Sequence, residues 1–513
     1  KQYVPESLLK IPIIKPYIVM AIGLMILFSS ARIRNGYFTM LLAHIAFCTP
    51  YVVTSVYPKV RQMDASVADA AMDLGATPFE ALIKVIIPML KDGIYAGILL
   101  SFTMSFDDFV ISYFVTGNGV ENISIVVYNM TKRTNPTINA LSTIVILVIA
   151  ILIIVSKLVP NLLKNVMKRV LFAGFFIILG ISVFAGAKGN KKTLRVFNSG
   201  EYLDPELIER FEKENDCKII YETFDSNESM YTKLMSGAEY DVLVTSDYMI
   251  ERLIKEDKLQ PVNWDNITNK DAINPDNLGY EFDPQNKYSV PYFVGTVGIL
   301  YNRNVVDEED LKDGWNLLQN TKYAGDIYMI DSERDSFMIA QKSLGYSMNT
   351  TDKNEIDEAY KWLLKQKKNM DVVYAGDDVM DNMISGNKDI AVVYSGDGAY
   401  IMAENDELDY FDPPEGTNEW CDALVMTKEC RDTELAEKFM DYTLEYDVCY
   451  TNSIFVGYTT PVKQVMEDMK KSEFEGINAY DPVFGAPNNE VFRYQDMKTK
   501  QYTADLWTKI KAY

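Results

Sequence analysis

The chain has 513 residues, a length that suggests roughly two to four domains, and a formal net charge of −22. Its one histidine is His44, so composition excludes Ser-His-Asp and Cys-His catalysis from the later part of the chain. The charge is uneven, because residues 1–187 carry 15 Lys/Arg and 9 Asp/Glu whereas residues 188–513 carry 35 and 63. A basic part is therefore joined to an acidic one, and no nucleic-acid partner is expected.

The first part of the chain contains apolar runs that approach the ~20 residues a bilayer requires. They lie at Pro16–Ser29, Tyr37–Tyr57, Gly93–Thr116, Pro136–Ser156 and Val170–Ala187. No run of that length follows Ala187, so the remainder is expected to be soluble. The chain begins at Lys1 rather than Met, and we expect it to be a processed or truncated piece of a longer protein.

Basic residues orient these spans through the positive-inside rule. They cluster around the segment between the second and third runs and just before Val170, and both clusters are expected in the cytoplasm; the residues are Lys59, Arg61, Lys84, Lys91, Lys157, Lys164, Lys168 and Arg169. Val170–Ala187 is then expected to cross the membrane toward the outside and to remain as an uncut anchor. The sequence thus predicts a multi-pass protein of the cell membrane with an extracytoplasmic C-terminal domain.

The loop that contains Asp69 has a helical pattern interrupted at Gly75. Thr77 before Pro78 is typical of an N-cap followed by proline at the first helical position. The pattern predicts two short helices with a sharp joint. A plain solvated connector between two spans is the alternative.

This loop resembles the coupling loop of ABC importer permeases, whose pattern is E-A-A, three residues, Gly, nine residues, an aliphatic, one residue, an aliphatic and Pro. Asp69, Ala70, Ala71, Gly75 and Pro88 match that spacing, with Asp in place of Glu. The resemblance implies that these residues couple the chain to a separate ABC ATPase subunit. The aliphatic positions are Val85 and Ile87.

Two further stretches, "HIAFCTPYVVTSVY" from His44 and "SFTMSFDDFVISYFVTG" from Ser101, resemble the spermidine/putrescine permeases. The resemblance covers roughly residues 12–160 and implies an all-α transmembrane bundle, a type I ABC importer permease that works with a second permease subunit. That family has six spans, and the two missing ones fit a truncated start. Asp107 and Asp108 lie inside a span, where acids are costly, so they are either pathway residues or helix-end acids.

From Thr193 the pattern alternates between strands and helices. Strands are predicted at Thr193–Asn198, Lys218–Phe224 and Tyr240–Ser246, and helices at Glu206–Glu214, Ser229–Met235 and Tyr248–Lys255. A βαβαβ start predicts a parallel sheet. About 320 residues suit two such lobes with a cleft between them.

This part resembles the polyamine-binding receptors of ABC importers over its whole length. The fragments "FNSGEY", "YDVLVTSDY", "YSVPYFVGTVGILYN", "SLGYSMNTTD" and "EWCDAL" occur in the order seen in that family. The resemblance implies a two-lobed α/β periplasmic-binding-protein fold at residues 191–513, joined by a linker and anchor at 161–190 to a partial permease at 1–160.

The resemblance also implies a ligand site, transferred position by position. Its residues are Glu201, Tyr202, Ser246, Tyr248, Ser332, Asp335, Tyr394, Asp397, Trp420, Asp422 and Tyr458. Carboxylates hold ammonium groups by charge-assisted hydrogen bonds, and aromatic faces hold both methylenes and cations, which suits a polyamine. Gln495 is a loosely aligned further candidate.

Two departures bear on ligand length. Ser332 stands where the spermidine receptors have an acid, and Asp397 matches the putrescine receptors, so we expect both polyamines to bind with a slight preference for putrescine.

No catalytic residue, metal or cofactor is expected. An importer for another cationic or small organic solute and a membrane-tethered sensor are the alternatives. Four cysteines outside the spans, Cys217, Cys421, Cys430 and Cys449, allow three disulfide pairings or four free thiols.

Overall fold

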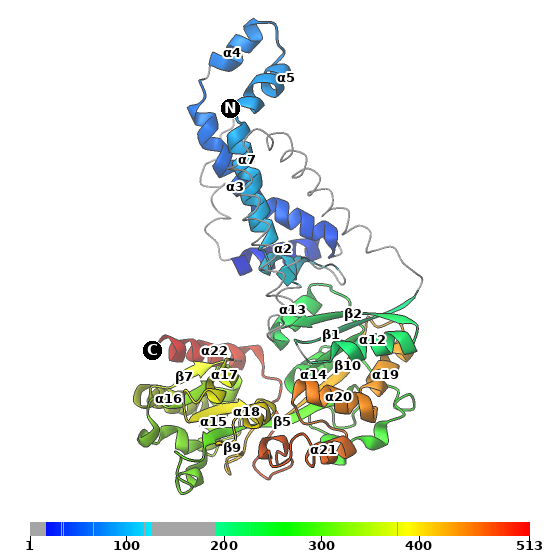
Figure 1. Ribbon diagram of the computed structural model, residues 1–513, viewed down its shortest axis with the longest axis vertical. Helices are drawn as coiled ribbons and strands as arrows, with labels where there is room; N and C mark the ends of the chain where they lie inside the picture. Colours follow the sequence, from blue (N-terminus) through cyan, green and yellow to red (C-terminus); the bar gives the residue numbers. More distant parts are fainter. Residues whose placement is uncertain are drawn as a thin grey trace, which may run out of the picture. The chain divides into compact units, whose positions relative to one another are not determined.

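The structure is a computed structural model that describes residues 17–116 except 32, 34 and 65, then 120, 122, 124 and 125, and 191–513 except 201, 225 and 377. The predicted spans Pro136–Ser156 and Val170–Ala187 lie outside the described residues. Contacts divide the chain into two compact units, one mainly residues 1–192 and the other mainly 193–513, and each is treated by itself (Figure 1).

Every element described in the first unit is helical. The elements are α2 (Tyr17–Ser30), α3 (Tyr37–Gln62), α4 (Ser66–Asp73), α5 (Pro78–Ala81), the π-helix η1 (Leu82–Ile86), α6 (Ile87–Met89), α7 (Lys91–Phe106) and α8 (Val110–Val115). Within the described part of this unit, α3 is long and apolar enough to cross a membrane, and Pro78–Met89 with Lys91–Phe106 forms a second candidate bent by 70°. Glycines let α7 pack closely on α3, because a Cβ added at Gly97 would lie 3.2 Å from Val52.

The predicted span Gly93–Thr116 is wrong as a single helix. Helix α7 ends at Phe106 and α8 begins at Val110, so the backbone is irregular at Asp107–Phe109. Non-helical backbone at membrane depth requires other partners for its polar groups. Here Asp108 accepts the backbone amides of Ile111 and Ser112, which explains why the helix can break at this point.

The two short helices predicted in the Asp69 loop are confirmed. Gly75 follows α4 with φ +87, a backbone conformation that favours glycine. Thr77 then caps α5, since its hydroxyl accepts the amide of Glu80 and the Glu80 carboxylate accepts the amide of Thr77. This reciprocal capping fixes the joint between the two helices.

The second unit is a sheet with helices around it. Its strands are β1 (Lys192–Ser199), β2 (Cys217–Phe224), β3 (Val242–Ser246), β4 (Leu259–Gln260), β5 (Ser289–Asn302), β6 (Ile327–Ile330), β7 (Val373–Ala375), β8 (Ile390–Tyr394), β9 (Leu408–Phe411) and β10 (Glu419–Thr427). Its α-helices are α12 (Pro205–Glu214), α13 (Asn227–Met235), α14 (Asp247–Lys255), α15 (Glu333–Ser343), α16 (Lys353–Met370), α17 (Val379–Ile384), α18 (Ser395–Glu404), α19 (Thr433–Tyr442), α20 (Tyr446–Val456), α21 (Lys463–Met469) and α22 (Met497–Ala512). Short 3₁₀ helices are η2 (Lys270–Ala272), η3 (Pro275–Asn277), η4 (Asp310–Gln319), η5 (Thr321–Tyr323) and η6 (Asn478–Tyr480). The six predicted elements from Thr193 to Lys255 are all confirmed, with small differences at their ends.

The strands run in the order β2-β1-β3-β10-β5-β8-β6-β7, with β4 beside β10 and β9 beside β5. The predicted parallel sheet holds for β1 with β3 and for β6 with β7 and β8. It is wrong at the centre, where β10 is antiparallel to β3 and β5, and β5 is antiparallel to β8. These central strands connect the two halves of the sheet, and they are not joined by the helical crossovers that link parallel strands.

Strand β5 belongs to both halves, and we name the halves lobes. Its residues Ser289–Thr296 pair with β10, and Val297–Tyr301 pair with β8. The first lobe contains β1–β4, β10 and helices such as α12, α14 and α20; the second contains β6–β9, α15–α18 and α22 (Figure 1). Residues near the middle of β5 and β10 therefore lie where the lobes meet.

All five cysteines are buried, and none of them forms a disulfide. Of the alternatives left open by the sequence, the three disulfide pairings among Cys217, Cys421, Cys430 and Cys449 do not occur in the structure. Burial raises the pKa of the Cys449 thiol to about 12, so this side chain is an unreactive part of the core.

Candidate functional site

Asp422 occupies the middle of β10, directly opposite Ser246 at the end of β3. The hydroxyl of Tyr202, which follows β1, donates to Asp422 Oδ2 at 2.7 Å. Burial raises the pKa of Asp422, while hydrogen bonds from Ser246 and Tyr202 lower it. The first lobe thus presents a desolvated carboxyl held by two hydroxyls, an arrangement that favours binding of a cation.

Aromatic rings surround this carboxyl. Trp420 is two residues away on β10 and therefore faces the same side of the sheet. The ring centroid of Tyr458 lies 5.3 Å from that of Trp420 and 5.8 Å from that of Tyr202. Gly295 leaves room for the Trp420 ring, because an added Cβ would lie 2.5 Å from it. Such a wall suits an apolar chain that carries positive charge.

A second buried carboxyl comes from the other lobe. Asp335 in α15 is 3% exposed, and its Oδ2 accepts the hydroxyls of Ser332 at 2.6 Å and Tyr394 at 3.0 Å. Ser332 also caps α15, since its hydroxyl accepts the Asp335 amide. Burial raises the pKa of Asp335, and the hydrogen bonds from Ser332 and Tyr394 lower it. The Tyr394 ring in turn lies edge-on to Trp420 with centroids 6.2 Å apart.

The two lobes meet at Asp397 and Tyr458. The Tyr458 hydroxyl, from the first lobe, donates to Asp397 Oδ1 in α18 of the second lobe at 2.9 Å. The ring packs directly on the backbone of Gly396, where an added Cβ would lie 1.6 Å from it. Any larger residue at Gly396 would displace Tyr458, so the glycine is required for this interlobe contact.

Nine of the eleven residues expected from the sequence therefore form one connected cluster. It consists of Tyr202, Ser246, Ser332, Asp335, Tyr394, Asp397, Trp420, Asp422 and Tyr458. Glu201 lies outside the described residues. Gln495 is half-buried in the segment before α22.

Tyr248 has a different environment from the one expected. Its hydroxyl faces the Glu228 carboxylate at 3.3 Å, and the guanidinium of Arg334 lies 3.8 Å from its ring centroid. Burial raises the pKa of Tyr248, and the charge of Glu228 adds to this. One face of the ring is therefore already occupied by a cation of the protein.

Sequence reasoning missed Arg334, Glu228 and Asp247. Asp247 is 1% exposed, and burial raises its pKa well above the ordinary value, with the charges of Asp422 and Arg334 acting in opposite directions. Its position between Ser246 and Tyr248, two expected ligand residues, was the available signal. An acid at the start of a helix is otherwise an ordinary N-terminal residue.

In the first unit, Asp107 and Asp108 differ. Asp108 is buried, and its Oδ2 accepts the Ser112 amide at 2.9 Å and the Ser112 hydroxyl at 3.0 Å. His44 Nε2 lies 3.5 Å from the same oxygen, and Asn122 donates to the Ser112 hydroxyl. Asp108 is thus the centre of a polar network at the helix break, whereas Asp107 is exposed within the described part of the unit.

The Asp69 loop exposes apolar side chains. Leu74 is 90% exposed beside Gly75, and Phe79 at the start of α5 is 71% exposed. Asp69, Ala70 and Ala71 lie on α4, which has no buried residue, and Pro88 lies in α6. Exposed apolar residues held on a rigid helical joint are typical of a protein-binding surface.

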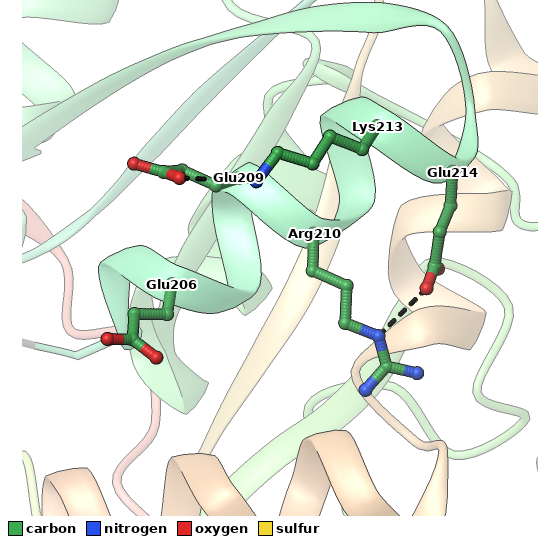
Figure 2. A pocket seen from close by; sticks show the side chains of 5 residues that line it. All are labelled: Glu206, Glu209, Arg210, Lys213 and Glu214. Atoms are coloured by element: carbon green, nitrogen blue, oxygen red, sulfur yellow. Dashed lines mark hydrogen bonds and ion pairs between the residues drawn. The ribbon is translucent and has the colours of Figure 1, made fainter.

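The hollow shown in Figure 2 is unrelated to this cluster. It is lined by Glu206, Glu209, Arg210, Lys213 and Glu214, all from α12. Arg210 pairs with Glu214 at 2.9 Å and with Glu445 and Asp447 of the same lobe, and Lys213 pairs with Glu209. A shallow depression along one charged helix gives no reason to expect a specific ligand.

Two family models match the chain. Residues 206–475 match the bacterial extracellular solute-binding protein family, and residues 7–183 match the binding-protein-dependent transport system inner membrane component family. The first match covers much of the second structural unit. The second extends through the segment that contains the Asp69 loop.

Individual relatives agree with both matches. The chain is 33% identical over 295 residues to the spermidine/putrescine-binding periplasmic protein of Escherichia coli K12, which covers 57% of this chain and 84% of that protein. It is 41% identical over 144 residues to a spermidine/putrescine transport system permease protein of the same organism, covering 28% of this chain and 54% of that one.

Among solved structures, the spermidine/putrescine ABC transporter substrate-binding protein of Streptococcus pneumoniae is 35% identical, with a TM-score of 0.56 over 63% of this chain and 99% of that one. The second unit therefore has the periplasmic-binding-protein fold, and its relatives exist as separate proteins. The chain belongs to the bacterial extracellular solute-binding protein family and carries, on the same polypeptide, a segment that is similar to the inner membrane components of binding-protein-dependent transport systems.

Proposed function

We propose that this chain is the membrane subunit of a polyamine ABC importer, combining translocation pore and solute receptor for putrescine and spermidine. The observation that carries the proposal is a pair of desolvated carboxyls, one from each lobe: Asp422 is half-buried and Asp335 is buried. The Trp420 ring is linked to Asp422 through Tyr458 and Tyr202, and to Asp335 through Tyr394. A polyamine matches this pattern, because its ammonium groups are separated by an apolar chain. The names of the relatives point to the same ligands.

In the proposed mechanism the lobes close on the polyamine and the loaded domain docks on the pore. A separate ATPase subunit binds the Asp69 loop and opens the pore together with a second permease subunit. The first 160 residues form part of a helical bundle in the cell membrane, residues 161–190 link and anchor, and residues 191–513 lie outside the cytoplasm. Asp107 is the acid proposed to face the pathway, since Asp108 is engaged at the helix break.

Ligand binding by residues 191–513 tests the proposal. Calorimetry should show binding of putrescine and spermidine, with a modest preference for putrescine, because the acid at Asp397 in place of one at Ser332 shifts where an ammonium group can sit. Glycine and maltose are the controls and should not bind. A ten-fold preference for spermidine, about 1.4 kcal/mol, would overturn the order of the two polyamines. Tight binding of glycine or maltose would overturn the polyamine assignment itself.

Binding should also depend on pH. Burial raises the pKa of both Asp335 and Asp422 in the empty domain, and an ammonium binds the ionised form. Affinity should therefore be greatest above these raised pKa values and fall as pH drops through them, by up to about ten-fold per pH unit for each acid that must lose a proton. Dissociation constants measured from pH 8 to pH 4.5 at constant ionic strength would show this. A constant affinity across that range would contradict a role for either acid.

A further inference from the structure

Arg334 lies between acids of the two lobes. It is the second residue of α15, in the second lobe, and its guanidinium rests on the ring of Tyr248 in α14 of the first lobe. The charge of Arg334 lowers the pKa of four nearby acids against the raising effect of burial; they are Glu228, Asp247, Glu333 and Asp335. On balance the pKa of Glu228 is lowered, mainly through its hydrogen bond with Lys500, and the pKa values of the other three are raised. Two of these acids belong to each lobe, so Arg334 neutralises repulsion between them.

A second cation makes the same connection. Lys500 in α22, a helix that packs on α15 and α16 of the second lobe, donates to Glu228 Oε1 at 2.7 Å. Glu228 opens α13 of the first lobe, and its carboxylate also faces the Tyr248 hydroxyl. Glu228 and Tyr248 of the first lobe are thus contacted by two cations of the second lobe, Lys500 and Arg334.

Polar atoms of opposite charge remain unpaired beside these contacts. Arg334 Nη1 is buried without a hydrogen-bond partner among the described residues. Asp247 Oδ2 is likewise buried without a hydrogen bond of ordinary geometry in the described part of the chain, although the Cys421 backbone amide nearby lowers the pKa. The two groups lie on opposite lobes, and they are close enough for the charge of Arg334 to lower the pKa of Asp247.

We propose that Arg334, seated on Tyr248, and Lys500, paired with Glu228, form an interlobe clamp that retains the ligand. They are positioning residues, because the carboxyls assigned to the ammonium groups are Asp422 and Asp335. The clamp rests on the proposed function, and it gives Tyr248 a role in closure instead of a role as a ligand wall. Without the two cations, the facing acids would repel and the open form would become more populated.

Binding kinetics of residues 191–513 test the clamp. Arg334→Met and Lys500→Met should each release putrescine about ten-fold faster while the association rate changes little, because the clamp acts after encounter. Spermidine should be affected to the same extent, since the clamp does not read ligand length. A much larger effect on spermidine than on putrescine would make Arg334 a ligand contact and overturn the clamp.

Three further variants separate the clamp from general loss of charge. Arg210→Met removes an arginine whose ion-pair partners Glu214, Glu445 and Asp447 lie in the first lobe, and it should leave dissociation unchanged. Figure 2 shows its pair with Glu214. Arg334→Lys should restore part of the retention, because lysine also binds an aromatic face. Asp247→Asn should add little to Arg334→Met if the two groups pair, and additive effects would contradict that pairing.

Interlobe distances give a readout that does not require ligand. Spin labels at Lys213→Cys in α12 and Lys361→Cys in α16 would react selectively, because both lysines are exposed and all five native cysteines are buried. Arg334→Met should broaden the distance distribution of the empty domain toward longer values. If the unmodified domain bound no polyamine, the proposed function would fail while this measurement still tested the clamp. Unchanged distances together with unchanged dissociation rates would overturn the clamp.

Discussion

Replacing Asp422 with Asn should weaken polyamine binding by residues 191–513 by tens-fold or more. The carboxyl is half-buried and receives hydrogen bonds from Tyr202 and Ser246, so in the complex it would hold an ammonium group in a desolvated setting. Removing one partner of such a charge pair typically costs ~2–5 kcal/mol. Calorimetry on the two purified proteins measures the difference directly, and an unchanged dissociation constant would remove Asp422 from the site.

Stability distinguishes loss of a ligand contact from loss of the fold. The folded-state pKa of Asp422 is raised, so the stability of the empty domain falls as pH rises from the ordinary carboxyl pKa to the raised one, and it stays at the lower level above that. Asn is neutral and similar in shape, so the empty variant should melt at the same or a higher temperature at neutral pH. Its gain in melting temperature on adding putrescine should shrink.

Asp283 provides the matched control. It is a buried acid of the first lobe whose carboxylate accepts the amides of Lys287, Tyr288 and Ser289. Asp283→Asn weakens these bonds and should lower the melting temperature while leaving polyamine affinity unchanged. Asp422→Asn should therefore lower polyamine affinity without lowering the melting temperature, whereas Asp283→Asn should lower the melting temperature without changing the affinity. Similar changes in both variants would mean that both acids are structural.

Local sequence patterns were enough to predict the elements that depend on neighbouring residues. The capped turn Thr77-Pro78 and the start of α12 at Asp204-Pro205 are examples, because N-caps and first-turn prolines act within one helical turn. Most residues of the cluster were predicted from the resemblance to polyamine-binding receptors, because members of one family bring the same positions together in space. The sequence by itself could not pair Tyr202 with Asp422, which are 220 residues apart.

The failures share a physical cause. The break at Asp107–Phe109 and the antiparallel strands β5 and β10 both depend on partners remote in sequence, such as His44 for Asp108 and β8 for β5. Asp107 and Asp108 interrupt the apolar run, but the sequence does not show which remote side chains, such as His44, complete the polar network at the break. Arg334 was missed for the same reason, because its partner Tyr248 lies in the other lobe.

Replacing Gly75 with Asp should abolish polyamine uptake by the assembled importer while leaving ligand binding by the outer domain intact. Gly75 has φ +87 at the joint between α4 and α5, next to the exposed Leu74. An aspartate there would strain the joint by roughly 1 kcal/mol and add a charge to an apolar docking surface, which costs more when buried against a partner. Gly345→Asp is the control, because Gly345 also has positive φ and open space around it but lies in the outer domain.

Uptake of labelled putrescine by cells that express the importer, with calorimetry on the purified outer domain, separates the two functions of the chain. The substituted loop should no longer engage the ATPase subunit, so polyamine would be captured and not transported. Gly345→Asp should retain both activities, since its backbone strain is matched but its position is remote from the loop in sequence. Normal uptake by Gly75→Asp would show that the Asp69 loop is a simple connector between helices, and the coupling role of Asp69, Ala70, Ala71 and Pro88 would fall with it.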